Sequence, residues 1–188
     1  MKKYLRMAAF WYPVTVFGKG KKLAVWFQGC SKKCKACISP EYQKYDGGTD
    51  IAVEELFSLM KDTVPDGLII SGGEPFDQPE ALYELVNTFE ARYGDDILVY
   101  TGYRLDELTE KNDPMIEGTI KKIAVLIDGT YMQEMDSGKG LAGSKNKKIY
   151  VMKHQQKYQD AENWERQLMC ILREDNSIWM IGVPPLEA

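Results

Sequence analysis

Strand-like apolar runs alternate with helical patterns over the first two thirds of the chain, and this alternation constrains the fold more than any other feature. The runs are continuously apolar, as is typical of strands that are covered on both faces. They lie at residues 23–27, 67–71, 97–101 and 123–127. Strands separated by helices at this spacing form βαβ units, whose strands run parallel. We therefore expect an α/β fold built on a parallel sheet.

Two helices are predicted between these runs. Apolar residues recur at helical spacing over 53–60, and Asp50 stands where an N-cap is expected. The same spacing recurs over 82–93, behind Pro79, which is tolerated in the first turn of a helix.

The pattern weakens after Asp128. Residues 137–148 are rich in Gly, Ser and Lys and predict a long loop, and a further strand is expected at 149–152. Residues 161–174 have a helical apolar face with Cys170 on the opposite side, and 177–183 predict a final strand. There is no internal repeat and no clear second domain.

Charge and cysteine usage narrow the function classes. The chain has 188 residues and a net charge of −4, which argues against a general nucleic-acid binder. It contains no targeting signal and no run of about 20 apolar residues that would cross a membrane. Four cysteines, three of them clustered, do not form the disulfide framework of a small secreted domain. We therefore expect a soluble, cytoplasmic protein.

The cysteine cluster is the strongest chemical signal in the chain. Cys30, Cys34 and Cys37 form a C-x3-C-x2-C loop, and the one histidine, His154, is far away. Structural zinc takes four ligands, usually in two C-x-x-C pairs, so zinc fits poorly. A 4Fe–4S cluster fits better, because three thiolates leave one iron open to a substrate or cofactor. Cys170 as a fourth ligand is the less favoured alternative.

Lysines gather around this loop although the chain is acidic overall. A solvated surface and a functional surface, such as one that docks an acidic electron donor, are both open interpretations. The lysines are Lys19, Lys21, Lys22, Lys32, Lys33 and Lys35.

A second motif follows the cysteine loop, at the end of the next predicted strand. Residues 69–75 read IISGGEP, and with the C-x3-C-x2-C loop this resembles the radical S-adenosylmethionine superfamily. The segments DILVYTGYRLDEL (96–108), IAVLIDGTY (123–131) and LAGSKN (141–146) are similar to landmarks of the anaerobic ribonucleoside-triphosphate reductase activating family. The resemblance covers roughly residues 1–153.

The resemblance implies a fold and a site. The fold is a partial (β/α) barrel of parallel strands, shorter than a full TIM barrel, over 1–153. A helix–strand extension at 154–188 packs on the same domain. The three cysteines hold one 4Fe–4S cluster. S-adenosylmethionine contacts the following residues: the backbone of Ala36 and Ile38, then Gly72, Gly73, Glu74, Pro75, Thr101 and Asp128. Ala36 departs from the aromatic residue that many superfamily members carry, and the extension departs from the minimal activase.

The same resemblance implies an activity. A glycyl-radical-enzyme activase cleaves S-adenosylmethionine reductively to a 5′-deoxyadenosyl radical and generates a glycyl radical on a partner. Here that partner is an anaerobic ribonucleotide reductase, with a flavodoxin- or ferredoxin-like electron donor and no nucleic acid or membrane. A radical maturase of a peptide or small molecule is one alternative. A plain iron–sulfur electron carrier is another, weakened by the GGEP segment, which such a carrier does not need.

Overall fold

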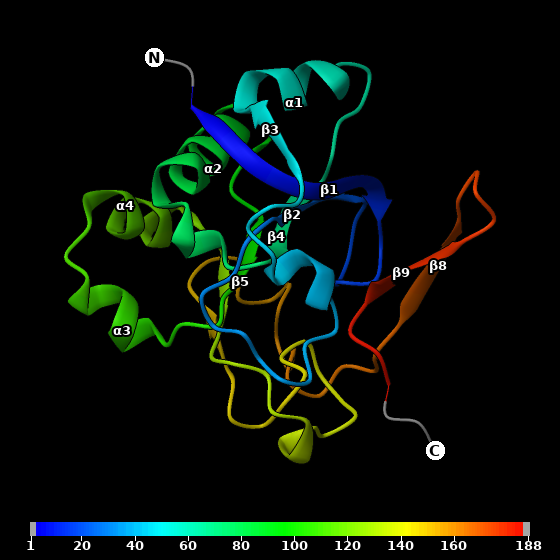
Figure 1. Cartoon of the computed structure of the whole chain (residues 1–188). Coiled ribbons are helices and arrows are strands. Elements are labelled where there is room, and N and C mark those ends of the chain that lie inside the picture. Colours follow the sequence, from blue (N-terminus) through cyan, green and yellow to red (C-terminus); the bar gives the residue numbers. More distant parts are fainter. Residues whose placement is uncertain (1–2, 186–188) are drawn as a thin grey trace.

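The computed structural model describes residues 3–185 and is built around a seven-stranded sheet (Figure 1). The strand order is β3-β1-β2-β4-β5-β6-β7. The strands are β1 (Tyr4–Val14), β2 (Lys22–Phe27), β3 (Thr49–Ala52), β4 (Gly67–Gly72), β5 (Ile97–Tyr100), β6 (Val125–Asp128) and β7 (Lys148–Val151). β2, β4, β5 and β6 pair in parallel, whereas β1 and β7 pair antiparallel to their neighbours. The fold is therefore mixed α/β with a mostly parallel central sheet, as the alternation predicts.

Helices cover one face of this sheet. They are α1 (Val53–Leu59), α2 (Pro79–Tyr93), α3 (Leu105–Glu110) and α4 (Pro114–Lys122). Their apolar residues join Leu23, Leu68 and Val99 of the strands in one buried cluster. None of the helices in residues 3–185 is long and apolar enough to cross a membrane.

The opposite face of the sheet is covered by the C-terminal segment. Ile69 and Leu98 belong to a second buried cluster with Tyr158, Ala161 and Ile181. Successive strand residues thus enter different cores, which is why these runs are continuously apolar. Although residues beyond 153 contact the same sheet, a boundary at that position stays a prediction.

The predicted strands of the sheet are confirmed within two residues at each end, and the helices at 53–60 and 82–93 are confirmed as α1 and α2. The cap predicted for the first helix is wrong. Asp50 lies in β3, and Ala52 is the N-cap of α1. Sequence reasoning also missed β1, β3, α3 and α4. At the start of α4, the Asp113 side chain accepts from the N–H of Met115 at 2.7 Å.

The helix predicted at 161–174 is wrong. The structure has instead an antiparallel hairpin of β8 (Leu168–Leu172) and β9 (Ile178–Gly182), the second of which is the predicted final strand. Asn176 has a φ of 64° in the connecting turn, a conformation that Asn tolerates better than most residues. Trp179 of β9 packs on Trp11 and Trp26, with ring centroids 5.9 and 5.0 Å apart. This tertiary contact holds β9 on the sheet, and the pairing of β8 with β9 outweighs the helical spacing of residues 161–174.

Candidate active site

Parallel strands bring the sequence-predicted site residues to one edge of the sheet. Cys30 comes shortly after β2, Glu74 after β4, and Thr101 directly after β5, while Asp128 is the last residue of β6. Because β2, β4, β5 and β6 are parallel, their carboxyl ends meet at this edge. Ligand sites in α/β folds form there. The topology therefore assembles residues that are nearly 100 positions apart.

The cysteine loop, residues 30–37, is held by backbone hydrogen bonds on both sides. Gly29 donates its N–H to the carbonyl of Tyr42 at 2.8 Å, and Glu74 donates its N–H to the carbonyl of Gly29 at 2.8 Å. Cys30 is buried, whereas Cys34 and Cys37 are half-buried, and all three are free thiols. Burial raises the pKa of the Cys30 thiol. Backbone hydrogen bonds within the chain therefore attach the loop to the end of β4.

The glycine pair makes this attachment possible. A Cβ on Gly73 would lie 2.1 Å from the carbonyl oxygen of Gly29. A Cβ on Gly72, whose φ is +102°, would lie 2.4 Å from the backbone nitrogen of Phe27. The sequence prediction gave these glycines a role in close approach to a ligand. The structure adds a different one, because they let the β4 end approach the backbone that leads into the cysteine loop.

Glu74 joins the ends of β4 and β5. Its carboxylate accepts from the Thr101 hydroxyl at 2.8 Å, the Gly102 N–H at 2.7 Å and the Phe76 N–H at 3.0 Å. The residue is 1% exposed. Burial outweighs these three donors and raises the pKa of Glu74 to about 7. The sequence prediction placed Glu74 in contact with S-adenosylmethionine, whereas both of its carboxylate oxygens already accept hydrogen bonds from neighbouring groups.

Thr101 and Asp128 are similarly engaged. The Thr101 hydroxyl donates to Glu74 and accepts from the N–H of Tyr103 at 3.0 Å. The Asp128 carboxylate accepts from the N–H of Leu105 at 2.8 Å and that of Lys148 at 3.2 Å. Both side chains tie the strand ends to the following loops.

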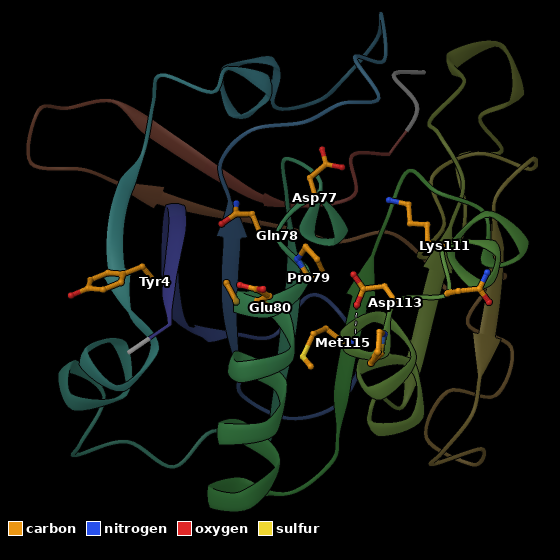
Figure 2. A pocket seen from close by; sticks show the side chains of 11 residues that line it. Tyr4, Asp77, Gln78, Pro79, Glu80, Lys111, Asp113 and Met115 are labelled. Carbon is orange, nitrogen blue, oxygen red and sulfur yellow. Dashed lines mark hydrogen bonds between the residues drawn. The ribbon is translucent and has the colours of Figure 1, made fainter. Parts of the chain in front are cut away.

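Asp77 is a site residue that sequence reasoning missed. Its carboxylate accepts from the Ser31 N–H at 2.8 Å, the Ser31 hydroxyl at 3.0 Å and the Tyr103 hydroxyl at 2.9 Å. Figure 2 shows this carboxylate directed away from Pro79 and Glu80 at the start of α2. Asp77 therefore anchors the residue that follows Cys30. An acidic residue just before a helix suggests a cap, so the sequence carried no signal for this contact.

An open pocket of about 770 Å³ lies at the starts of α2 and α4. Figure 2 shows the side chains that line it. Several of its polar side chains already have partners within the protein. Gln78 bonds the backbone of Arg6, and Asp113 caps α4. The cysteines do not line it. The chemistry therefore belongs to the strand ends rather than to this pocket.

The donor set fits an iron–sulfur cluster better than a single metal ion. Within residues 3–185, no group of three or more His, Cys, Asp or Glu side chains is placed to hold one ion. A cluster takes one thiolate at each of several irons, so its ligands need not converge on one point. Beside the thiols, Ala36 is half-buried and Ile38 is 64% exposed, which leaves this part of the loop open to a ligand. Cys170 is exposed on β8.

Comparisons with known proteins agree with this chemistry. The family model described as "4Fe-4S single cluster domain" matches residues 16–150. The anaerobic ribonucleoside-triphosphate reductase-activating protein of Haemophilus influenzae is 33% identical over 76% of this chain and 96% of the relative. The protein of the same name from Escherichia coli K12 is 29% identical over 76% of this chain and 97% of the relative.

More distant likenesses are partial. The pyruvate formate-lyase-activating enzyme of Clostridium pasteurianum is 35% identical over 38% of this chain and 32% of the relative. The solved structure of QueE from Escherichia coli has a TM-score of 0.45 and 16% identity over 53% of this chain and 52% of that chain, too distant a likeness to carry an argument. The chain belongs to the 4Fe-4S single cluster domain family and is a radical S-adenosylmethionine oxidoreductase of the glycyl-radical-enzyme activating type, with a 4Fe–4S cluster and S-adenosylmethionine as its cofactors.

Proposed function

We propose that this protein cleaves S-adenosylmethionine reductively and uses the resulting radical to form a glycyl radical on an anaerobic ribonucleoside-triphosphate reductase. The observation that carries the proposal is the C-x3-C-x2-C loop, which lies against the GGEP segment at the carboxyl ends of the parallel strands. Relatives matched over three quarters of the chain carry the name of a reductase-activating protein. Bound at this edge, the cluster and S-adenosylmethionine would supply one electron and a 5′-deoxyadenosyl radical.

The protein's own groups would hold and orient these cofactors. Cys30, Cys34 and Cys37 would hold the cluster as thiolates, and one iron would stay open. Asp77 fixes the backbone next to Cys30, and Glu74 locks the adjoining strand ends, so the loop is set before the cofactors bind. Pre-set geometry lowers the entropy that binding would otherwise cost.

S-adenosylmethionine would lie across the loop and the strand ends. Its contacts would be the backbone of Ala36 and Ile38 and the turn at Gly72, Gly73 and Pro75. Because Glu74, Thr101 and Asp128 are buried and hydrogen-bonded, we assign them mainly to shaping this surface.

The sheet itself would be a partial barrel whose open mouth admits a protein substrate. The four parallel strands are half the number in a full (β/α)8 barrel. A glycine residue of a partner protein can reach such an open mouth, whereas a small metabolite would need a more enclosed cavity.

An acidic electron donor, flavodoxin- or ferredoxin-like, would dock on the exposed lysines of the loop. Lys33 and Lys35 are exposed, whereas Lys32 is occupied by Glu107 at 3.2 Å and by the ring of Tyr103 at 3.5 Å. We therefore assign the docking charge to Lys33 and Lys35. Reversing both charges should slow reduction of the cluster and remove its dependence on ionic strength. A reducing cytoplasm, where free thiols persist, is the compartment that we propose.

The test of the activity is an anaerobic reconstitution. The reduced, cluster-loaded protein is mixed with S-adenosylmethionine and candidate partners, 5′-deoxyadenosine is quantified, and the partner is examined by electron paramagnetic resonance. A glycyl-radical doublet on a ribonucleotide reductase is the expected result. A doublet only on a different enzyme would reject the reductase, and modification of a peptide without any doublet would favour a maturase. Reduction of the cluster without cleavage of S-adenosylmethionine would indicate that the protein is an iron–sulfur electron carrier.

A further inference from the structure

Lys147 places a positive charge at the same edge of the sheet. It precedes β7, and its Cγ lies 3.7 Å from the position that a Cβ on Gly129 would occupy. Its ammonium is 5.4 Å from the centroid of the Tyr100 ring. Tyr100 ends β5, and Gly129 follows the last residue of β6. The side chain therefore crosses the carboxyl ends of two parallel strands, where the cysteine loop also lies.

Among the described residues, this ammonium has the Tyr100 ring as a neighbour but no anionic partner. Within residues 3–185, no carboxylate lies within 4.0 Å of it and no hydrogen bond holds it. Burial lowers the pKa of Lys147 to about 8, although the charges of Cys34, Glu74, Asp128 and Cys37 oppose that shift. Lys147 is half-buried. Lys22, which is fully buried, is by contrast bonded to Asp96 and Tyr158. A charge that is partly removed from water is stabilised by an anionic partner, and the described residues place none in contact with the Lys147 ammonium.

The neighbouring residue shows a second unmet hydrogen-bonding group. Asn146 donates through Nδ2 to the carbonyl of Thr130 at 2.8 Å. Its Oδ1 is buried and has no donor among the described residues. Buried acceptors are nearly always paired, so an orphaned one indicates a missing group. Two adjacent residues directly before β7 thus each carry a polar group without a hydrogen-bonding or anionic partner among the described residues.

We propose that Lys147 binds the α-carboxylate of S-adenosylmethionine and thereby fixes the amino-acid end of the cofactor beside the cysteine loop. The carboxylate is the only anionic group of this cofactor, and its sulfonium would be repelled by an ammonium. The carboxylate end must therefore face Lys147. This inference rests on the proposed function, which requires that the protein bind S-adenosylmethionine.

The experiment compares two ligands on the anaerobic, cluster-loaded protein. S-adenosylmethionine carries the carboxylate, whereas 5′-methylthioadenosine retains the adenosine and the S-methyl group but lacks the amino-acid end and the sulfonium charge. Equilibrium dissociation constants are measured for wild type, Lys147→Met and Lys147→Arg. Lys148→Met is the matched control, because the Lys148 side chain is exposed and only its backbone N–H contacts Asp128. Iron content and the reduction potential of the cluster are recorded for each variant.

Lys147→Met should weaken S-adenosylmethionine binding on the order of 10- to 100-fold, the loss expected of one charge-assisted hydrogen bond, and leave 5′-methylthioadenosine binding unchanged. Lys147→Arg should retain most of the affinity, and Lys148→Met all of it. Unchanged S-adenosylmethionine binding in Lys147→Met would overturn the role of Lys147, as would equal weakening of both ligands. A shifted cluster potential with unchanged affinity would assign the charge to the cluster and also overturn it. A loaded wild type that does not bind S-adenosylmethionine would overturn the proposed function itself.

Discussion

Replacing Asp96 by Asn should destabilise the protein strongly, because Asp96 neutralises the charge of Lys22 at the amino ends of the parallel strands. Lys22 is 0% exposed and donates to the Asp96 carboxylate. Tyr158 donates to the same carboxylate at 2.5 Å, and Lys157 does so at 2.6 Å. This group joins the start of β2, the residue before β5 and the segment that follows β7.

The magnitude follows from burial. Removing one partner of a buried ion pair costs about 3–5 kcal/mol, because it leaves an uncompensated charge. For a chain of this size the loss corresponds to a melting temperature lower by roughly 6–20 °C. Tyr158→Phe keeps the ion pair but removes one donor, so it should cost about 1–3 kcal/mol.

The assay is equilibrium denaturation followed by circular dichroism under anaerobic conditions. Glu80→Gln is the control, because Glu80 forms an ion pair with Lys3 while its side chain is 67% exposed, so the expected loss is about 0–1 kcal/mol. An Asp96→Asn variant no less stable than this control would refute the reasoning.

The pH dependence provides an independent check on Asp96. Burial opposes ionisation of Asp96, but the charge of Lys22 and hydrogen bonds from Lys157, Lys22 and Tyr158 prevail and lower its pKa. A lowered pKa contributes stability above the unfolded value of about 3.9, and that stability is lost as the pH falls through the folded value. The difference between wild type and Asp96→Asn should therefore narrow below about pH 4.

Three further predictions concern the site. Replacing any of the three loop cysteines by Ala should abolish the cluster, measured as iron content and cluster absorbance, while Cys170→Ala should retain it; loss only in Cys170→Ala would reject the open-iron arrangement. Gly73→Ala should lower iron content as well as cofactor affinity, because its Cβ would meet the Gly29 carbonyl at 2.1 Å; normal iron content would contradict that contact. Glu74, whose pKa is raised to about 7 by burial, should stabilise the protein fully below its unfolded pKa of about 4.3 and lose this contribution as the pH rises through 7. Wild type should therefore lose roughly 3 kcal/mol relative to Glu74→Gln between those values in pH-dependent denaturation, and parallel curves would contradict the raised pKa.

Local signals predicted the central sheet well. The strands β2, β4, β5 and β6 contribute residues to the buried clusters on both faces of the sheet. Their runs are therefore continuously apolar, and this can be recognised from the sequence. Residues 161–174 were mispredicted because their spacing suits a helix, whereas β8 within them pairs with β9. Trp179 of β9 in turn packs on Trp11 and Trp26, which lie far away in sequence. Packing on distant residues overrides local preference in such segments.

The sequence by itself determined which groups can do the chemistry, since three thiols in a short loop and the GGEP segment carry that information in their residue types and spacing. Only the tertiary structure decided what the surrounding side chains do. In the structure, Glu74 joins the ends of two strands and Asp77 bonds Ser31. Within residues 3–185, Lys147 contacts the Tyr100 ring but has no carboxylate within 4.0 Å. The physical reason is that hydrogen bonding and burial depend on neighbours from other strands, and those neighbours exist only once the parallel sheet has brought the strand ends together.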